Sequence, residues 1–344
     1  MRSTTGWQGS APGVLERASL QRRDMRPDDI AIRVDYCGVC HSDLHSLDHF
    51  DAHAQLVPGH EFTGVVTEVG GSVTGFSVGD PVAVGNIVDS CGECVMCEAG
   101  QENFCRSFPT LTYGGTDRHD DTTTLGGYSR EYVVRESFAY RLLEGLDPAA
   151  AAPLMCAGVT VWEPLRALNV GAGDRVAVVG LGGLGHLAVK LAAALGAEVT
   201  VISRTEDKRD DALQLGAGDF IVSSDPEQLA AARDSFDVVL DTISAAHDLG
   251  PYLKVVAMDG TLSLLGYLGT ANVDVIDLLM GRKKLSSAGS GGRTSTAEML
   301  KFCAENNVTT EVEVLPSSQV HTALERLWRN DVRYRFVLDL SDLD

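Results

Sequence analysis

The chain has 344 residues, of which 44% are hydrophobic and 22% charged, and this composition excludes a disordered chain, a collagen-like chain and a small disulfide scaffold. Its length predicts about two domains, each with a large core. The 28 basic and 48 acidic residues give a net charge of -20, which repels phosphate backbones and anionic lipids. We therefore expect neither a nucleic-acid nor a membrane partner.

The sequence contains no candidate targeting or membrane segment. No run of about 18 apolar residues is available to span a bilayer, and the N-terminal MRSTTGWQGSAPG lacks the apolar core of a secretory signal. These features predict a soluble, cytoplasmic protein. In such a reducing compartment, the eight cysteines are expected to be metal ligands or catalytic groups rather than disulfides.

The character of the sequence changes near residue 150. Within residues 1–150, short β-rich runs such as FTGVVTEVG and FSVGDPVAV are separated by glycines, which predicts a β-rich domain. Within residues 151–286, apolar runs alternate with helical runs, as in RVAVVG followed by LGHLAVKLAAALGA. This alternation predicts an α/β domain with a doubly wound parallel sheet.

The last segment, residues 287–344, differs again and is expected to return to the first domain. Ser295 with Glu298 three residues later has the pattern of a capping box, which predicts that a helix begins there. A second helix and the strand YRFVLDL follow.

A glycine-rich turn joins the strand RVAVVG to the helix that follows it. In a βαβ unit, the sequence GLGGLG is typical of a dinucleotide-binding turn, with the phosphates at the helix N-terminus. An ordinary strand-to-helix turn is the alternative. The candidate cofactor contacts in this turn are Gly180, Gly182, Gly183, Leu184 and Gly185.

The end of the next strand, EVTVIS, indicates which dinucleotide binds. An acidic residue there would bond the ribose 2′-hydroxyl of NAD, but the sequence has Ser203, Arg204 and then Lys208. A hydroxyl and two cations suit the 2′-phosphate of NADP. The alternative is that Arg204 and Lys208 are solvated charges at the start of a helix.

Four cysteines lie close together in one loop, CGECVMC and then FC, at Cys91, Cys94, Cys97 and Cys105. Four thiolates complete a tetrahedral coordination sphere, so the loop, residues 91–105, predicts a structural zinc site. An iron–sulfur cluster or two disulfides are the alternatives.

A second set of candidate ligands is scattered along the chain. Cys40 lies in CGVCHSD, His60 and Glu61 in PGHE, and Cys156 in LMCAGVT. Two thiolates and one imidazole would leave a fourth zinc position open for substrate. Taken singly, Cys156 also fits a buried small side chain and His60 a hydrogen-bonded loop residue, and spacing alone does not bring these residues together.

Together the motifs CGVCHSDLH, VPGHEFTGVV, CGECVMCEAGQENFC, APLMCAGVTVW, GLGGLGH and NDVRYRFV occur in this order. The chain thereby resembles the cinnamyl alcohol dehydrogenase branch of the zinc-dependent medium-chain dehydrogenases/reductases, from about residue 30 to residue 340. The resemblance implies a β-rich GroES-like catalytic domain and a Rossmann domain that binds NADP(H). It also implies two zinc ions per chain and a homodimer.

The resemblance assigns roles to individual residues. It implies that Cys40, His60 and Cys156 bind a catalytic zinc, with Glu61 as an additional or exchanging ligand, and that the four-cysteine loop binds a structural zinc. A Cys2His ligand set is typical of the catalytic zinc site of alcohol dehydrogenases. This assignment therefore follows from the resemblance and is not independent support for it.

Further positions match the proton relay and the cofactor contacts of the family. Ser42 falls where the relay hydroxyl lies, beside substrate and cofactor, and His45 where the outer histidine lies. Thr160 and Thr242 match positions that touch the cofactor. For Ser42 the alternative is a helix N-cap, and for His45 a solvated side chain like its neighbours His41, His49 and His53. Asp43 is either an anion at a helix start or a group that orients a ligand.

The expected function is hydride transfer between NADP(H) and a primary alcohol/aldehyde pair, mainly as an aldehyde reductase. One alternative on the same fold is a reductase of conjugated C=C or iminium bonds. An alternative from another class is a non-catalytic sensor of the NADPH/NADP ratio.

Overall fold

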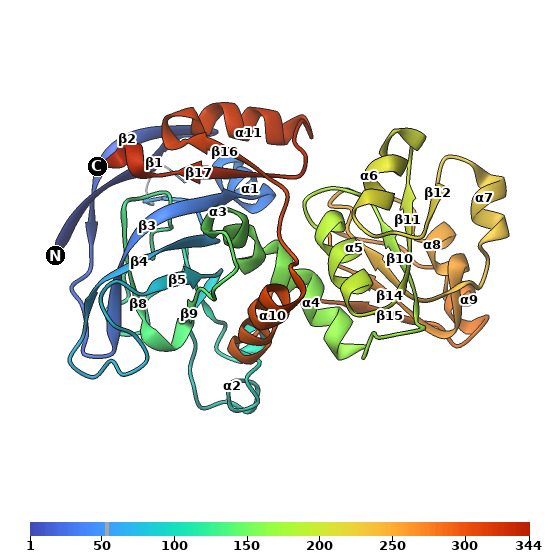
Figure 1. Ribbon diagram of the computed structural model, residues 1–344, viewed down its shortest axis with the longest axis horizontal. Helices are drawn as coiled ribbons and strands as arrows, with labels where there is room; N and C mark the ends of the chain where they lie inside the picture. Colours follow the sequence, from blue (N-terminus) through green and yellow to red (C-terminus); the bar gives the residue numbers. More distant parts are fainter. Residues whose placement is uncertain (52–54) are drawn as a thin grey trace. The chain divides into compact units, whose positions relative to one another are not determined.

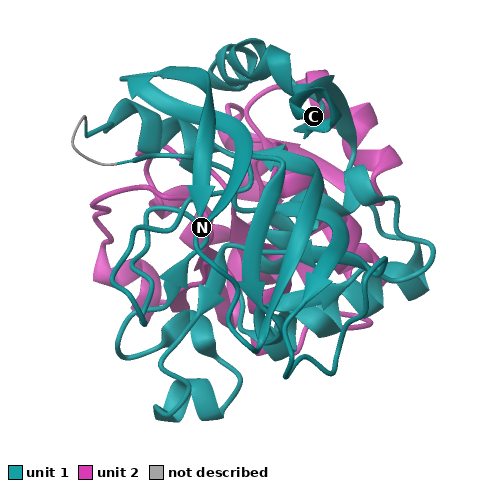
Figure 2. Ribbon diagram, turned by 90° about the vertical axis from the view of Figure 1, so that its left-hand side faces the viewer, with its two compact units in different colours: residues 1–159, 291–344 teal, residues 160–290 magenta. Residues whose placement is uncertain are grey.

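The computed structural model describes residues 1–51 and 55–344, and the chain divides into two compact units. Unit 1 comprises residues 1–159 and 291–344, and unit 2 comprises residues 160–290. Figure 2 shows the C-terminal segment in the same unit as the N-terminal part of the chain. Helix α4 (Ala157–Ala167) carries the chain from unit 1 into unit 2.

Unit 1 is built mainly on antiparallel strands, and only β16 and β17 pair in parallel among the described strands of its main sheet. Its main sheet has the order β16-β17-β3-β4-β5-β9, with β8 also pairing with β3, and the hairpin β1–β2 and the pair β6–β7 form smaller sheets (Figure 1). The strands are β1 (Arg2–Ala11), β2 (Val14–Arg22), β3 (Asp29–Val39), β4 (Phe62–Val69), β5 (Pro81–Val84), β6 (Ile87–Asp89), β7 (Thr110–Leu111), β8 (Glu131–Arg135), β9 (Ala139–Arg141), β16 (Val312–Pro316) and β17 (Arg335–Asp339).

The helices of unit 1 are mostly short. The α-helices are α1 (His41–Asp48), α2 (Val95–Glu98), α3 (Pro148–Ala151), α10 (Arg293–Asn306) and α11 (Val320–Trp328). The 3-10 helices are η1 (Glu102–Phe104), η2 (Glu136–Phe138), η3 (Ala152–Met155), η5 (Ser317–Gln319) and η6 (Ser341–Leu343).

The C-terminal segment belongs to unit 1 because strand β17 lies beside strand β3. Phe336 pairs with Val39 and Leu338 with Cys37, in antiparallel register. These apolar side chains share one buried core with others from the N-terminal strands, so segments from both ends of the chain form a single hydrophobic core.

Unit 2 is a parallel sheet with helices between its strands. The order β12-β11-β10-β13-β14-β15 reverses its direction between β10 and β13, which defines a doubly wound sheet and confirms the expected fold class. The strands are β10 (Arg175–Val179), β11 (Glu198–Ser203), β12 (Asp219–Val222), β13 (Phe236–Asp241), β14 (Val256–Leu264) and β15 (Lys284–Ser287). The helices are α5 (Gly185–Ala194), η4 (Glu206–Lys208), α6 (Arg209–Gln214), α7 (Pro226–Ala231), α8 (Gly250–Val255) and α9 (Val275–Leu279).

The predicted capping box at Ser295 is wrong. Helix α10 begins at Arg293 with Gly292 as its N-cap, so Ser295 is a buried residue of the first turn. A Cβ at position 292 would lie 1.9 Å from the Gly100 carbonyl oxygen, so this close backbone approach requires glycine and places the helix start there.

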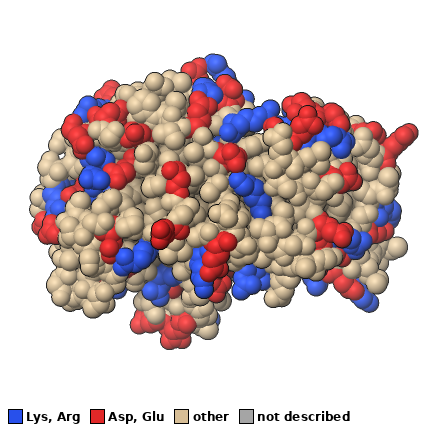
Figure 3. All heavy atoms as spheres, in the orientation of Figure 1, with Lys and Arg blue, Asp and Glu red and all other residues tan. Residues whose placement is uncertain are grey.

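Charged side chains of both signs occur on the surface. On the face drawn in Figure 3, acidic and basic residues are interspersed. Many surface cations lie against an acid, as in the pairs Arg175–Asp237 at 2.8 Å and Arg2–Glu68 at 2.7 Å. Within the ranges described, no helix combines the length and the apolar character needed to cross a membrane.

Candidate active site and metal centres

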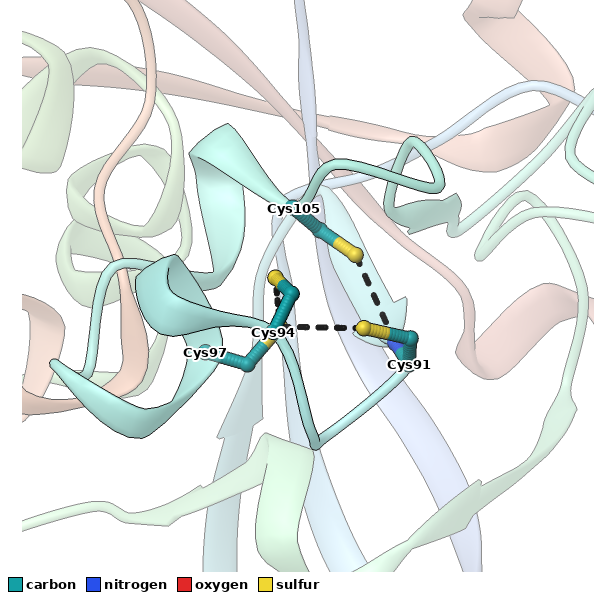
Figure 4. A group of neighbouring side chains, drawn as sticks. All are labelled: Cys91, Cys94, Cys97 and Cys105. Carbon is teal, nitrogen blue, oxygen red and sulfur yellow. Dashed lines mark hydrogen bonds between the residues drawn. The ribbon is translucent and has the colours of Figure 1, made fainter.

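The four cysteines of the loop 91–105 come together in the structure (Figure 4). Cys91 follows β6, Cys94 is the N-cap of α2, Cys97 lies in α2 and Cys105 follows η1. Their sulfur atoms all lie within 4.8 Å of one another.

The sulfur separations in this loop fit a tetrahedral zinc ion. The Sγ atoms of Cys91 and Cys97 are 3.8 Å apart, and those of Cys94 and Cys97 are 3.5 Å apart. Zinc–sulfur bonds of about 2.3 Å place the sulfurs of a tetrahedral site about 3.8 Å apart. A hydrogen bond from the backbone amide of Arg106 lowers the pKa of Cys94 to about 6, which favours the thiolate that a metal requires.

The second set, Cys40, His60 and Cys156, also converges. Cys40 follows strand β3 and is the N-cap of α1, His60 precedes β4, and Cys156 follows η3. Their ligand atoms lie within 4.8 Å of one another, and His60 Nε2 is 3.2 Å from Cys156 Sγ. The hydrogen bond from the Cys156 thiol holds the pKa of Cys40 well below its usual range.

Asp43 orients this second set. Its carboxylate has no solvent exposure, and it accepts hydrogen bonds from Cys40 N at 2.9 Å, Gly59 N at 3.2 Å and the Tyr128 hydroxyl at 3.2 Å. His60 Nδ1 lies 3.2 Å from the same carboxylate. Because Nδ1 donates to Asp43, Nε2 keeps its lone pair for a metal. Asp43 thus has both roles that the sequence left open, since its bond to Cys40 N also caps α1.

The Glu61 carboxylate pairs with a guanidinium group and is not part of the cluster formed by Cys40, His60 and Cys156. It forms a fully buried ion pair with Arg335 of β17, which is 5% exposed. Burial raises the pKa of Glu61 to about 8, although the guanidinium opposes this rise. The second carboxylate oxygen, Oε2, makes no hydrogen bond with any described residue. Glu61 therefore has an oxygen that a metal could recruit, as an exchanging ligand requires.

Ser42 and His45 lie on α1, next to the second set. Ser42 Oγ is 3.5 Å from Cys40 Sγ, and because Cys40 is the N-cap, Ser42 is not the helix cap that the alternative proposed. His45 is exposed, and its ring centroid lies 4.2 Å from that of His49. His53 lies outside the described residues.

The glycines in the turn of unit 2 have three different backbone environments. Gly180 has a φ of 87°, a left-handed conformation that favours glycine. A Cβ on Gly185 would lie 2.1 Å from the Gly180 carbonyl oxygen, whereas a Cβ on Gly182 would meet no atom within 4 Å. Gly183 and Leu184 complete the turn, and Leu184 is the N-cap of α5. The turn is therefore tight at its ends and open at Gly182, where a diphosphate can approach the backbone.

The residues expected to select NADP lie at the same edge of the sheet. Ser203 ends β11, Arg204 is exposed, and Lys208 Nζ donates to the Leu181 carbonyl oxygen at 2.9 Å. Lys208 is therefore held against the glycine turn rather than fully solvated. Its ammonium group and the Arg204 guanidinium can both meet a phosphate at this corner.

The two candidate threonines of unit 2 are also fixed. Thr242 Oγ1 donates to the Val179 carbonyl oxygen at 2.8 Å and lies 3.3 Å from that of Gly180. Thr160, in α4, is 8% exposed, and its Oγ1 accepts a hydrogen bond from Ser290 N at 3.2 Å.

Sequence reasoning missed Arg335 and Tyr128 as partners of the candidate ligands. Arg335 stands in the motif NDVRYRFV, but only the position of β17 beside β3 shows that it meets Glu61. A cation at the start of an apolar strand was the available signal, because a buried charge requires a partner. Tyr128, in GGYS, gave no comparable signal.

The family models agree with this architecture. Residues 26–144 match the alcohol dehydrogenase GroES-like domain, and residues 183–305 match the zinc-binding dehydrogenase model. Together these matches confirm the expected combination of a GroES-like and a Rossmann domain.

Individual relatives cover nearly the whole chain. NADP-dependent alcohol dehydrogenase C 1 of Mycolicibacterium smegmatis is 46% identical over 338 residues, which are 97% of each chain. A probable formaldehyde dehydrogenase of Bacillus subtilis is 45% identical over 97% of this chain and 96% of the relative. The cinnamyl alcohol dehydrogenase SbCAD4 of Sorghum bicolor superposes with a TM-score of 0.94 at 42% identity, over 98% of both chains.

The fold, the two cysteine clusters and these matches define a zinc-dependent dehydrogenase of the medium-chain type. The chain belongs to the zinc-dependent alcohol dehydrogenase family, in its cinnamyl alcohol dehydrogenase branch. It is therefore an alcohol dehydrogenase.

Proposed function

We propose that the protein is a two-zinc, NADP(H)-dependent alcohol dehydrogenase that interconverts primary alcohols and aldehydes and works mainly as an aldehyde reductase. The observation that carries this proposal is the meeting of Cys40, His60 and Cys156 from three separate segments of unit 1. Three protein ligands leave one position for the substrate oxygen. The four-cysteine loop would hold the second, structural zinc.

The zinc ion and the nicotinamide cofactor would supply the chemistry of hydride transfer. When bound, zinc would polarise the substrate oxygen as a Lewis acid, and the nicotinamide ring would donate or accept the hydride. Asp43 keeps His60 in the tautomer that binds metal. Arg335 holds Glu61 beside the ligands and balances its charge.

The cofactor site is proposed for unit 2, and the substrate and metal sites for unit 1. In unit 2, Gly180 to Gly185 would receive the diphosphate, while Ser203, Arg204 and Lys208 would bind the 2′-phosphate. Thr160 and Thr242 would contact the rest of the cofactor. The acid expected of an NAD-selective strand end is missing at Ser203, which favours NADP. The NADP-dependent relatives support the same preference.

A proton must accompany each hydride. Ser42 Oγ, which lies beside Cys40 Sγ, would pass the proton to the substrate oxygen. His45, exposed on the next turn of α1, would exchange that proton with water through its imidazole ring.

A panel of aliphatic, aromatic and terpenoid aldehydes, each with NADPH and with NADH, tests cofactor and substrate together. We expect oxidation of NADPH that depends on the aldehyde and is much faster than oxidation of NADH. Product analysis with an α,β-unsaturated aldehyde should show the allylic alcohol. Reduction of the C=C bond instead would overturn the proposal, and so would tight NADPH binding without turnover.

Metal analysis tests the two sites separately. Wild-type protein should contain about two zinc ions per chain. Cys156→Ser should lose activity and one zinc, while Cys94→Ser should lose the other zinc and unfold at a lower temperature. Cys303→Ala, a core cysteine beside Met299, is the matched control and should keep both ions. A fully active enzyme with less than one zinc per chain would refute the mechanism.

We also propose a homodimer that forms through unit 2. Strand β15 is at one edge of the parallel sheet and pairs only with β14 among the described strands. The segment between β14 and β15, and β15 itself, carry exposed apolar side chains, which a second copy of the sheet edge would cover. They are Tyr267, Val275, Ile276, Leu279, Met280 and Leu285.

The cysteines support the proposed location in the cytoplasm. None of the eight, all of which the structure describes, forms a disulfide. Reduced thiols, most of them gathered in candidate metal sites, suit a reducing compartment.

A further inference from the structure

A buried acid stands at the edge of the sheet where the cofactor is proposed to bind. Asp241 is the last residue of β13, immediately before Thr242, and it has no solvent exposure. Its Oδ1 accepts a hydrogen bond from Ile243 N at 3.1 Å. Its backbone oxygen accepts a further bond from Leu265 N at 2.8 Å, so Asp241 joins the segments that follow β13 and β14. A negative charge here would repel an anionic dinucleotide.

His247 determines the charge of this acid. Its Nε2 lies 2.8 Å from Asp241 Oδ2, and its Nδ1 lies 2.8 Å from the Ala245 carbonyl oxygen. A carbonyl oxygen only accepts, so Nδ1 must carry a proton. One further proton then lies between Nε2 and Oδ2. Whichever atom holds this proton, the pair has no net charge.

The same segment supports the glycine turn. Thr242, the residue after Asp241, donates through its backbone amide to the Val179 oxygen at 3.0 Å and through Oγ1 to the same oxygen at 2.8 Å. Thr242 Oγ1 is also 3.3 Å from the Gly180 oxygen. A displacement of the Asp241–His247 segment would therefore move the start of the turn.

On its other side, His247 reaches toward the corner proposed to bind the 2′-phosphate. Its ring meets the Tyr252 ring edge to face, with centroids 5.6 Å apart and an interplanar angle of 74°. Tyr252 is hydrogen-bonded through its side chain to Ser223, and Ser223 N donates to the Ser203 oxygen at 2.8 Å. A continuous series of contacts thus runs from the glycine turn to Ser203.

We propose that His247 is a positioning residue for the dinucleotide: it neutralises Asp241 and holds the segment 241–247 against the glycine turn, so that the cofactor phosphates meet no buried negative charge. This inference rests on the proposed function, because it assumes that unit 2 binds NADP(H). On this proposal, cofactor affinity depends on the neutrality of the Asp241–His247 pair and not on the volume of the two side chains.

Three variants separate charge from packing. His247→Gln retains a donor toward Asp241 but leaves the carboxylate charge uncompensated, so NADPH affinity should fall about tenfold. In Asp241→Asn the amide can donate to Nε2 of a neutral His247, and affinity should stay within about twofold of wild type. In the double variant Asp241→Asn/His247→Gln all groups are neutral, and affinity should return to within about threefold of wild type.

The readouts are the dissociation constant of NADPH, measured by titration calorimetry, and KM and kcat measured separately. For His247→Gln we expect KM for NADPH to rise with kcat nearly unchanged at saturating cofactor. His321→Gln is the matched control, because His321 accepts a hydrogen bond from Leu15 N and meets the Trp7 ring edge to face, but lies in unit 1. This control should bind NADPH like wild type.

Equal losses of affinity in Asp241→Asn and His247→Gln, or no recovery in the double variant, would overturn the inference. If His247→Gln does not fold, the wild-type affinity expected of Asp241→Asn and of the double variant still tests it. Failure of the wild-type protein to bind either NADPH or NADH would instead refute the proposed function. If the wild type prefers NADH, the same affinity ratios measured with NADH test the role of His247.

Discussion

At the scale of single residues, one carboxylate determines how His60 is presented to a metal. The Asp43 carboxylate accepts hydrogen bonds from two backbone amides, one imidazole and one phenol, and all of these groups are buried or nearly so. The four contacts leave Asp43 no freedom to rotate away from His60. The orientation of His60 Nε2 is therefore set before any metal arrives.

Replacement of this acid should weaken the metal site. Asp43→Asn retains the shape but loses the charge that supports His60, and we expect a 10- to 100-fold loss of affinity for the catalytic zinc. Competition with a chromophoric chelator measures this affinity. Tyr128→Phe is the control: it removes one donor to Asp43 and should cost about 1 kcal/mol of unfolding free energy with little change in zinc affinity. Similar zinc affinity in Asp43→Asn and wild type would contradict the assigned role.

Cofactor preference is also decided by single side chains. Arg204→Ala removes an exposed guanidinium from the corner beside Ser203, so KM for NADPH should rise about tenfold while KM for NADH changes little. Arg209→Ala is a matched control, because Arg209 lies on the same segment but pairs with Glu206 and covers the Phe220 ring. Steady-state kinetics with both cofactors measures the effect. Equal changes for NADPH and NADH would show that Arg204 does not read the 2′-phosphate.

At the scale of elements, the glycines of the β10–α5 turn contribute differently to the stability of the fold and to cofactor binding. Its glycines occupy one turn but meet different surroundings: Gly185 packs against backbone, and Gly182 faces open space. The same substitution should therefore have different consequences at the two positions.

Gly185→Ala should destabilise the fold by about 1–3 kcal/mol, because its Cβ would overlap the Gly180 carbonyl oxygen and move α5. Gly182→Ala should leave the melting temperature within about 2 °C of wild type. Its methyl group would stand where the diphosphate approaches, so NADPH affinity should fall at least about tenfold. Thermal unfolding and cofactor titration on both variants test this contrast. A stable Gly185→Ala protein or a tightly binding Gly182→Ala protein would contradict it.

At the scale of the whole molecule, the main sheets of the two units have outer strands that differ in their surroundings. β15 of unit 2 begins with Lys284, but it and the segment before it carry several exposed apolar side chains, whereas β16 of unit 1 carries Glu313 and follows Glu311. Exposed apolar side chains favour burial against a second copy, and charges on an edge strand oppose pairing. This difference is the reason that the dimer is proposed through unit 2.

A single lysine should therefore separate the subunits only at β15. Leu285→Lys, at a side chain that is 39% exposed, should give a monomer at micromolar concentration in sedimentation velocity. Val314→Lys is the matched control, because Val314 is 43% exposed and lies on β16, an edge strand of unit 1. This control should leave the dimer intact. A wild-type protein that sediments as a monomer would refute the proposed dimer itself.

The sequence by itself determined the features that depend on neighbouring residues. The alternation of apolar and helical runs was sufficient for the doubly wound sheet of unit 2, and the glycine spacing for the turn after β10. Four cysteines within one short loop are brought together by local turns, because little chain has to be ordered to close such a loop. The helix start at Gly292 was missed, since it depends on contact with the distant Gly100.

Only the tertiary structure decided which distant groups meet. Cys40, His60 and Cys156 come together because β3, β4 and η3 pack in one unit, and Glu61 meets Arg335 because β17 pairs with β3. The neutrality of Asp241 likewise depends on the path that returns His247 to the end of β13. Spacing along the chain does not encode these contacts, because strand pairing and core packing determine them.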